Sequence, residues 1–98
     1  MQRITRKDLD GAVNRLNRIT DNQAEPYTGE HGKWFANIGN FHISGAYGGV
    51  ALHQMVNDAG GVRDIFGQGH IPMRDLYNLI HAYLKGIEYA RQEAEVTA

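Results

Sequence analysis

The stretch GNFHISGAYGGVALHQMV, residues 39–56, contains most of the sheet that the sequence predicts. Phe, His and Ile at residues 41–43 favour a strand, and the glycines within residues 45–49 are typical of a turn. Residues 50–56 alternate between two sets of side chains, as the two faces of a strand require. This stretch therefore predicts two strands joined by a turn.

A third strand is expected directly before this stretch. Trp34, Ala36 and Ile38 alternate with the residues between them, and the following Gly39-Asn40 pair tolerates the positive φ of a tight hairpin turn. The economical prediction is a meander of three short antiparallel strands.

One helix is predicted before the sheet and one after it. Thr5 and Asp8 form a capping arrangement, and apolar residues then recur at steps of three and four over residues 6–19. Pro72 suits the first turn of a second helix, whose apolar positions repeat over about four turns. The tail of residues 89–98 has few large apolar side chains and is expected to fray.

Two segments are predicted to be loops. Residues 21–32 are rich in Asn, Gly and acidic residues and show no hydrophobic period. Residues 57–69 contain four glycines around Val62, Ile65 and Phe66, which predicts a surface loop pinned by its own apolar side chains.

These elements predict one α+β domain over residues 1–98, with an N-terminal helix, a three-stranded antiparallel sheet and a long C-terminal helix. The two helices most economically cover one face of the sheet, which leaves the other face open. An open face with aromatic residues serves either as a homo-oligomer interface or as a ligand-binding surface. The sequence leaves both uses open, and we expect a homo-oligomer.

Composition narrows the functional classes. The 98 residues are 42% hydrophobic and 21% charged with a formal net charge of -1, so the sequence does not favour a nucleic-acid-coating role. The absence of cysteine favours a reducing compartment, and no apolar run approaches the roughly 18 residues of a membrane helix. We expect a cytoplasmic protein with no membrane partner.

No residue pattern predicts catalysis, a metal site or a cofactor. The five histidines lack the spacings of metal ligands, and there is no cysteine to complete a site. Ser44 with His42 or His53 is the one candidate nucleophile and base, but no acid stands in a suggestive relation to them. The glycine-rich segments lack the lysine of a phosphate-binding loop.

The residues near the glycine-rich turns are of the kinds that bind a small anionic nucleotide. Rings can stack on a base, asparagine amides can pair with its edge, and arginines can contact phosphate, while glycine lets backbone amides come close. For any single ring, packing on the sheet is the competing interpretation. The predicted ligand-binding residues are Asn40, Phe41, His42, Tyr47, Gly48, Gly49, His53, Asn57, Arg63, His70, Arg74 and Asn78.

From Ile4 to about Glu88, the chain resembles a group of small uncharacterised proteins of tailed bacteriophages, in the segments ITRKDL, NRLNRIT, GNFHISGAYGGVALHQMVN, GGV and GHIPMRDLYNLIHAYLKGIE. Small phage proteins of this size are often anti-defence factors. One class of these factors is similar in kind to this chain, namely the sponges that block Thoeris, CBASS and related immunity. Those sponges are oligomeric α+β proteins that sequester cyclic nucleotide signals without cleaving them. The resemblance implies a nucleotide sponge in the host cytoplasm, with no residue carried over by motif.

A nucleic-acid-binding or host-protein-binding accessory protein is the alternative. Helix, three strands, helix is also the order of a double-stranded RNA binding domain, but that family needs a basic cluster where this chain has only Arg74, with Asp75 beside it. Residues 1–20 carry a charge of +3, from five basic and two acidic residues, which is also typical of a solvated helix face.

Overall fold

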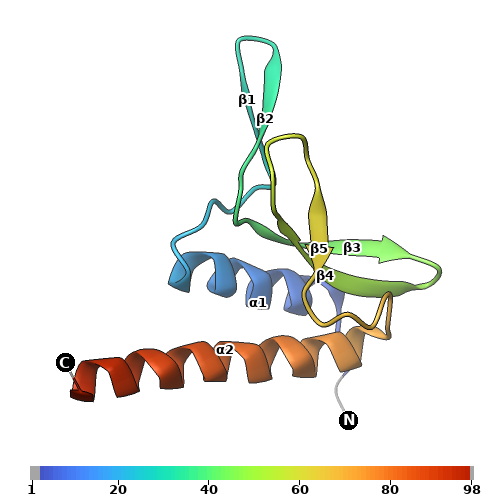
Figure 1. Ribbon diagram of the computed structural model, residues 1–98. Coiled ribbons are helices and arrows are strands. Elements are labelled where there is room, and N and C mark those ends of the chain that lie inside the picture. Colours follow the sequence, from blue (N-terminus) through green and yellow to red (C-terminus); the bar gives the residue numbers. More distant parts are fainter. Residues whose placement is uncertain (1–2, 98) are drawn as a thin grey trace.

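The computed structural model describes residues 3–97 and confirms the predicted α+β class, with a helix at each end of the chain and antiparallel strands between them (Figure 1). It contains five strands where the sequence predicted three. The elements in chain order are α1 (Arg6–Ile19), β1 (Tyr27–Glu30), β2 (Lys33–Ala36), β3 (Phe41–Ala46), β4 (Gly49–Met55), β5 (Val62–Asp64) and α2 (Met73–Thr97).

The hairpin β3–β4 is the centre of the fold, as the stretch of residues 39–56 predicts. The two strands pair from Phe41 opposite Gln54 to Ala46 opposite Gly49. The connecting turn is Tyr47-Gly48, with φ of 55° and 75°. Positive φ at both central residues matches the right-handed twist of the strands, which is why a two-residue turn closes this hairpin.

The predicted pairing of residues 34–38 with β3 is wrong. β2 pairs instead with β1, which lies inside the segment predicted as a loop, through a two-residue turn at His31-Gly32 with φ of 52° and 77°. Gly39 and Asn40 do not turn the chain back. Their backbone groups exchange hydrogen bonds with Met55, so they extend the β3–β4 pairing by one step.

The third strand of the main sheet is β5, in the segment predicted as a surface loop. β5 pairs with β4 from His53 opposite Asp64 to Met55 opposite Val62, so the strand order is β3-β4-β5. With three residues, β5 is too short for its alternation to be read from the sequence.

Both helices pack on one face of this sheet, as predicted, and they lie side by side (Figure 1). The α1 capping box at Thr5 and Asp8 is confirmed. The core is built from buried apolar side chains of both helices and the inner sheet face: Leu9, Ala12, Val13, Leu16, Phe41, Val50, Leu52, Leu76, Ile80 and Leu84.

Asn17 is a polar group inside this core. Its side-chain amide donates to the Phe41 carbonyl at 2.9 Å, and its side-chain carbonyl accepts from the Phe41 N–H at 2.8 Å. Since the side chain is 1% exposed, these bonds offset the cost of burying the amide. Asn17 therefore fixes α1 against the outer edge of β3.

The second helix continues to Thr97, beyond its last side chain packed on the core, Ile87. The tail predicted to fray is thus helical in the structure, and residues 88–96 are exposed along it. Fraying of this segment stays a prediction. Among residues 3–97, no helix has the length and apolar character to cross a membrane.

Candidate functional site

The face of the sheet away from the helices carries a continuous line of rings. His42 and His53 are direct cross-strand partners, with ring centroids 5.9 Å apart. His53 and His70 follow at 6.1 Å, and His70 and Tyr47 at 6.0 Å, all in edge-to-face geometry. We call these four side chains the ring row. They come from β3, the β3–β4 turn, β4 and the segment after β5, and they form one surface.

His70 joins the ring row because residues 65–71 run back along the edge of β4. Ile71 exchanges two backbone hydrogen bonds with Val50, at 2.8 and 2.9 Å, and the Ser44 hydroxyl lies 3.1 Å from His70 Nε2. Gly49 permits this approach, since a methyl group there would meet the backbone of His70 and Ile71 at 3.0 Å. The close contact favours glycine at this position, because a larger residue would displace this backbone by a few tenths of an ångström.

Tyr47 occupies an unfavourable place for its side chain. It is 99% exposed and lies at φ 55°, a region in which a bulky residue is a genuine outlier. Such backbone strain costs on the order of 1 kcal/mol or more, and an exposed phenol ring regains nothing by burial. The stability of the isolated chain does not account for a tyrosine here.

His42 is held in one tautomer by its surroundings. Its Nδ1 lies 3.1 Å from the side-chain oxygen of Asn40, whose amide nitrogen already donates to the Gln23 carbonyl at 2.7 Å. The Nδ1 therefore carries the proton and Nε2 is left as the acceptor. Burial, together with the neighbouring His53, holds the pKa of His42 below its usual value, so the ring is neutral at neutral pH.

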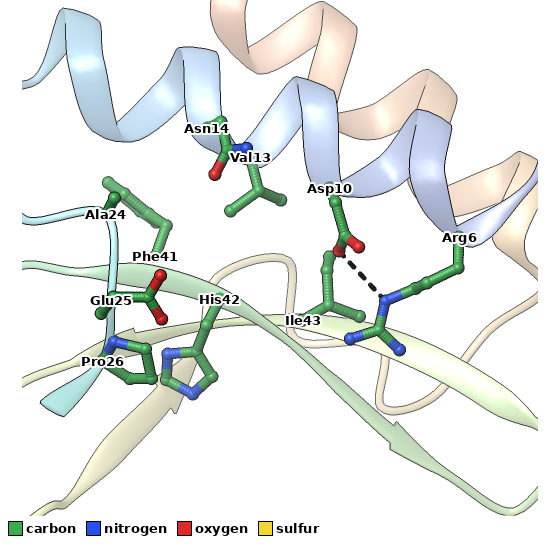
Figure 2. A pocket seen from close by; sticks show the side chains of 10 residues that line it. All are labelled: Arg6, Asp10, Val13, Asn14, Ala24, Glu25, Pro26, Phe41, His42 and Ile43. Atoms are coloured by element: carbon green, nitrogen blue, oxygen red, sulfur yellow. Dashed lines mark hydrogen bonds and ion pairs between the residues drawn. The ribbon is translucent and has the colours of Figure 1, made fainter.

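A cavity of about 420 Å³ lies along the free edge of β3, between α1 and residues 24–26. Figure 2 shows Arg6, Asp10 and Val13 projecting from α1 toward it, with His42 at its opposite side next to Pro26. We call it the β3-edge cavity. Its lining residues are Arg6, Asp10, Val13, Asn14, Ala24, Glu25, Pro26, Phe41, His42 and Ile43.

The charges around the β3-edge cavity are mixed. Arg6 Nε donates to the Asp10 carboxylate at 3.1 Å, and Glu25 adds a second carboxylate. One cation and two anions do not attract a polyanion, but carboxylates and the Asn14 amide accept and donate hydrogen bonds to a neutral polar ring. Because His42 lines the cavity and belongs to the ring row, the two surfaces are continuous.

Ser44 and His70 have the separation of a nucleophile and its base. The sequence could not pair them because they are 26 positions apart. The acid of a triad is not supplied by Asp64. Its carboxylate accepts from the amides of Phe66, Gly67 and Gly69 at 2.9 to 3.2 Å, which stabilises the turn after β5. Among residues 3–97, no three histidine, aspartate or glutamate side chains gather as metal ligands.

The structure brings together half of the predicted ligand-binding residues. His42, His53, His70 and Tyr47 form the ring row, and Gly48 and Gly49 shape the turn at its end.

The other six predicted residues lie elsewhere or act inside the fold. Phe41 is in the core and also lines the β3-edge cavity, and Asn40 is buried and positions His42. The Asn57 side chain accepts from the amides of Ala59 and Gly61 and so closes the turn between β4 and β5. Arg63 donates to the Gln54 side chain at 3.0 Å. Arg74 and Asn78 are exposed on α2, which packs on the opposite face of the sheet.

Sequence reasoning missed the α1 side of the site. Arg6 and Asp10 are an i, i+4 pair on the polar side of an amphipathic helix. The sequence alone does not show which part of the fold such a pair faces. Only the packing of α1 against β3 brings them to the cavity. Comparison with protein-family models, curated proteins and solved structures found no match to this chain. The function is therefore inferred from the chemistry of these residues.

Proposed function

We propose that this protein binds a small anionic nucleotide on the ring row and in the β3-edge cavity, and holds it without converting it. The observation that carries the proposal is the ring row itself, four rings joined edge to face and ending in the exposed, strained Tyr47. Strain retained at an exposed side chain is typical of a functional contact. In an infected cell such a protein would act as a sponge for a signalling nucleotide, as the resemblance to phage proteins implies.

The two surfaces suit the two halves of a nucleotide. A base can insert in the β3-edge cavity, where Asp10, Asn14 and Glu25 offer acceptors and a donor for its polar edge. The phosphate then lies toward His53 and His70, whose ring nitrogens donate to it. Stacking of a base contributes about 1 to 3 kcal/mol, so one base and one phosphate contact support micromolar affinity after the cost of association.

Retention of the ligand unchanged follows from the groups available. Among residues 3–97, His70 has no carboxylate partner that would orient and stabilise it as the base of a hydrolase. The carboxylate of Asp64, in the segment that leads from β5 to His70, is committed to backbone amides. The site therefore has groups that bind and orient a ligand. The contact between Ser44 and His70 connects residues 65–71 to β3.

The test is depletion of nucleotides from solution. The protein is incubated with a panel of linear and cyclic nucleotides, removed by filtration and then heated to release what it has bound. We expect one class to be depleted and recovered intact. The variant His53→Gln should weaken binding about tenfold, because a lost contact of about 1.4 kcal/mol changes the dissociation constant by that factor.

His31→Gln is the matched control, because His31 lies at the turn between β1 and β2, outside the ring row. It should bind like the parent chain. Conversion of any nucleotide would mean an enzyme, and a panel with no depletion would remove the proposal.

Duplex RNA binding is a second candidate, favoured by one observation. Apart from β1–β2, the chain has helix, three antiparallel strands and helix, with both helices on one sheet face, as in a double-stranded RNA binding domain (Figure 1). The net charge of -1 weighs against it, since duplex binding depends on cations at the phosphates. A mobility shift of duplex RNA that weakens with salt, without nucleotide depletion, would favour this candidate.

A further inference from the structure

The hairpin β1–β2, residues 27–36, stands away from the rest of the molecule (Figure 1). We call it the arm. Its two strands pair with each other and belong to a sheet separate from β3-β4-β5. Every residue of the two strands is exposed except Ala36, which is half-buried. The arm therefore contributes nothing to the core described above.

Large apolar side chains on the arm and at its base are left in water. Trp34 is 74% exposed, Phe35 52% and Ile38 62%. Neighbouring strand residues point to opposite faces, so Trp34 and Phe35 present aromatic surface on both sides of the arm. A two-stranded hairpin alone is at best marginally stable in water, and protruding aromatic surface marks an interaction site.

The arm is held at its base. The Asn37 N–H donates to the Pro26 carbonyl at 2.9 Å, and the Asn37 side chain donates to the Glu25 carbonyl at 2.9 Å. The Tyr27 hydroxyl lies against the turn after β4, where a methyl group at Gly60 would meet it at 2.6 Å. These contacts fix the direction in which the arm projects.

The arm is complementary to a copy of itself. Within residues 3–97, each of its strands has one edge without a strand partner. An edge strand can pair antiparallel with its own copy across a two-fold axis. Its formal charge is zero with His31 neutral, because Glu30 and Lys33 cancel, and these two residues lie directly across from each other. Two arms therefore meet without net repulsion, whereas a nucleic acid would require an excess of cations.

We infer that the arm is the interface of a homodimer, in which two arms pair along their edges and cover their aromatic side chains. This locates the expected self-association on the arm and leaves the open face with the ring row free for a ligand. The partner is a second copy of this chain, and the inference stands whether or not a nucleotide binds.

Trp34 is the single tryptophan of the chain, so its fluorescence reports directly on the arm. At micromolar to millimolar concentration, we expect light scattering to give twice the 11.0 kDa of one chain. Dilution should return the mass to that of one chain and shift the tryptophan emission to the red. The variant Phe35→Ser, which keeps Trp34, should weaken the dimer at least tenfold. Its red shift should therefore appear at a concentration at least tenfold higher than in the parent.

Tyr47→Ser is the matched control, because it removes an exposed aromatic side chain outside the arm and should leave the dimer intact. Circular dichroism of Phe35→Ser shows whether the core remains folded, which we expect because the arm lies outside it. A parent mass of one chain at every concentration would overturn the inference. A dimer unaffected by Phe35→Ser and by the double change Trp34→Ser with Phe35→Ser would do so as well.

Discussion

The two hairpins of this protein have nearly the same turn and opposite surroundings. The arm turns at His31-Gly32 with φ of 52° and 77°, and β3–β4 turns at Tyr47-Gly48 with φ of 55° and 75°. The helices cover one face of β3–β4, while both faces of the arm are in water. Equal turn chemistry with unequal burial shows that packing, and not the turn, makes one hairpin the scaffold and leaves the other available as a surface.

The largest expected effect is the loss of a core side chain from β4. Leu52 is fully buried, so Leu52→Ala should lower the free energy of unfolding by about 2 to 5 kcal/mol. In the arm, Phe35→Ala should change that free energy by less than about 0.5 kcal/mol when measured on the monomer. Urea unfolding followed by circular dichroism compares the two. Similar losses would show that the arm belongs to the cooperative core.

The turns give a sharper comparison, because Gly48 and Gly32 have nearly the same positive φ. Alanine costs on the order of 1 kcal/mol in this region through strain at the residue itself. Gly48→Ala should lower the global stability by about that amount, since β3–β4 unfolds with the core. Gly32→Ala should leave the global stability of the monomer unchanged and lower only the hydrogen-exchange protection of the arm. A global loss in both variants would contradict the separation of the two hairpins.

A smaller effect of opposite sign is expected at the residue before each of these glycines. Asparagine tolerates positive φ better than tyrosine, so Tyr47→Asn should raise the free energy of unfolding by about 0.5 kcal/mol. The same variant should weaken nucleotide binding, because it removes the end of the ring row. His31→Asn is the equivalent change in the arm and should leave nucleotide binding unchanged. Calorimetry and the depletion assay measure the two quantities. A destabilised Tyr47→Asn would show that the ring stabilises the turn.

The smallest effect is a pH dependence of stability that arises in the hairpin β3–β4. The pKa of His42 is lower in the folded chain than the 6.5 of an unperturbed histidine, so the unfolded chain binds the proton more readily. Stability from this source is present above pH 6.5, falls as the pH drops below that value, and levels off below the folded pKa. Urea midpoints measured from neutral to mildly acidic pH should show this loss, and His42→Gln should reduce it. A midpoint that rises on acidification would contradict the sign.

Sequence reasoning succeeded where side chains repeat over many residues. The stripe of α1, the apolar period of α2 and the alternation in β4 are each set by burial against the same core, so their patterns carry the fold class. It failed for the short strands. Residues 62–64 are held in the sheet by pairing with β4 and by the Asp64 cap, neither of which leaves a period in three residues.

The site was partly predictable for the same reason. His42 and His53 face each other because strand register follows from the turn, which the glycines of residues 45–49 indicate. His70 was proposed for its chemistry, but the Ser44 contact that positions it depends on the course of residues 65–71. Arg6 and Asp10 lie at the cavity only because of tertiary packing. Local pattern thus predicts the strand part of the site, and not the parts supplied by loops and helix packing.

The paired hydrogen bonds between Asn17 and Phe41 have a consequence for the behaviour of the protein in a crowded cell. β3 is an edge strand, and such an edge recruits strands of other chains into aggregates unless it is protected. The Asn17 carboxamide presents a donor and an acceptor to Phe41 as a neighbouring strand would, so it closes the edge at that residue. The arm has no such cover on its strand edges within the described residues. The strand edges of the arm are open, whereas the edge of β3 is capped at Phe41. A strand of another chain is therefore directed to the arm and away from β3–β4.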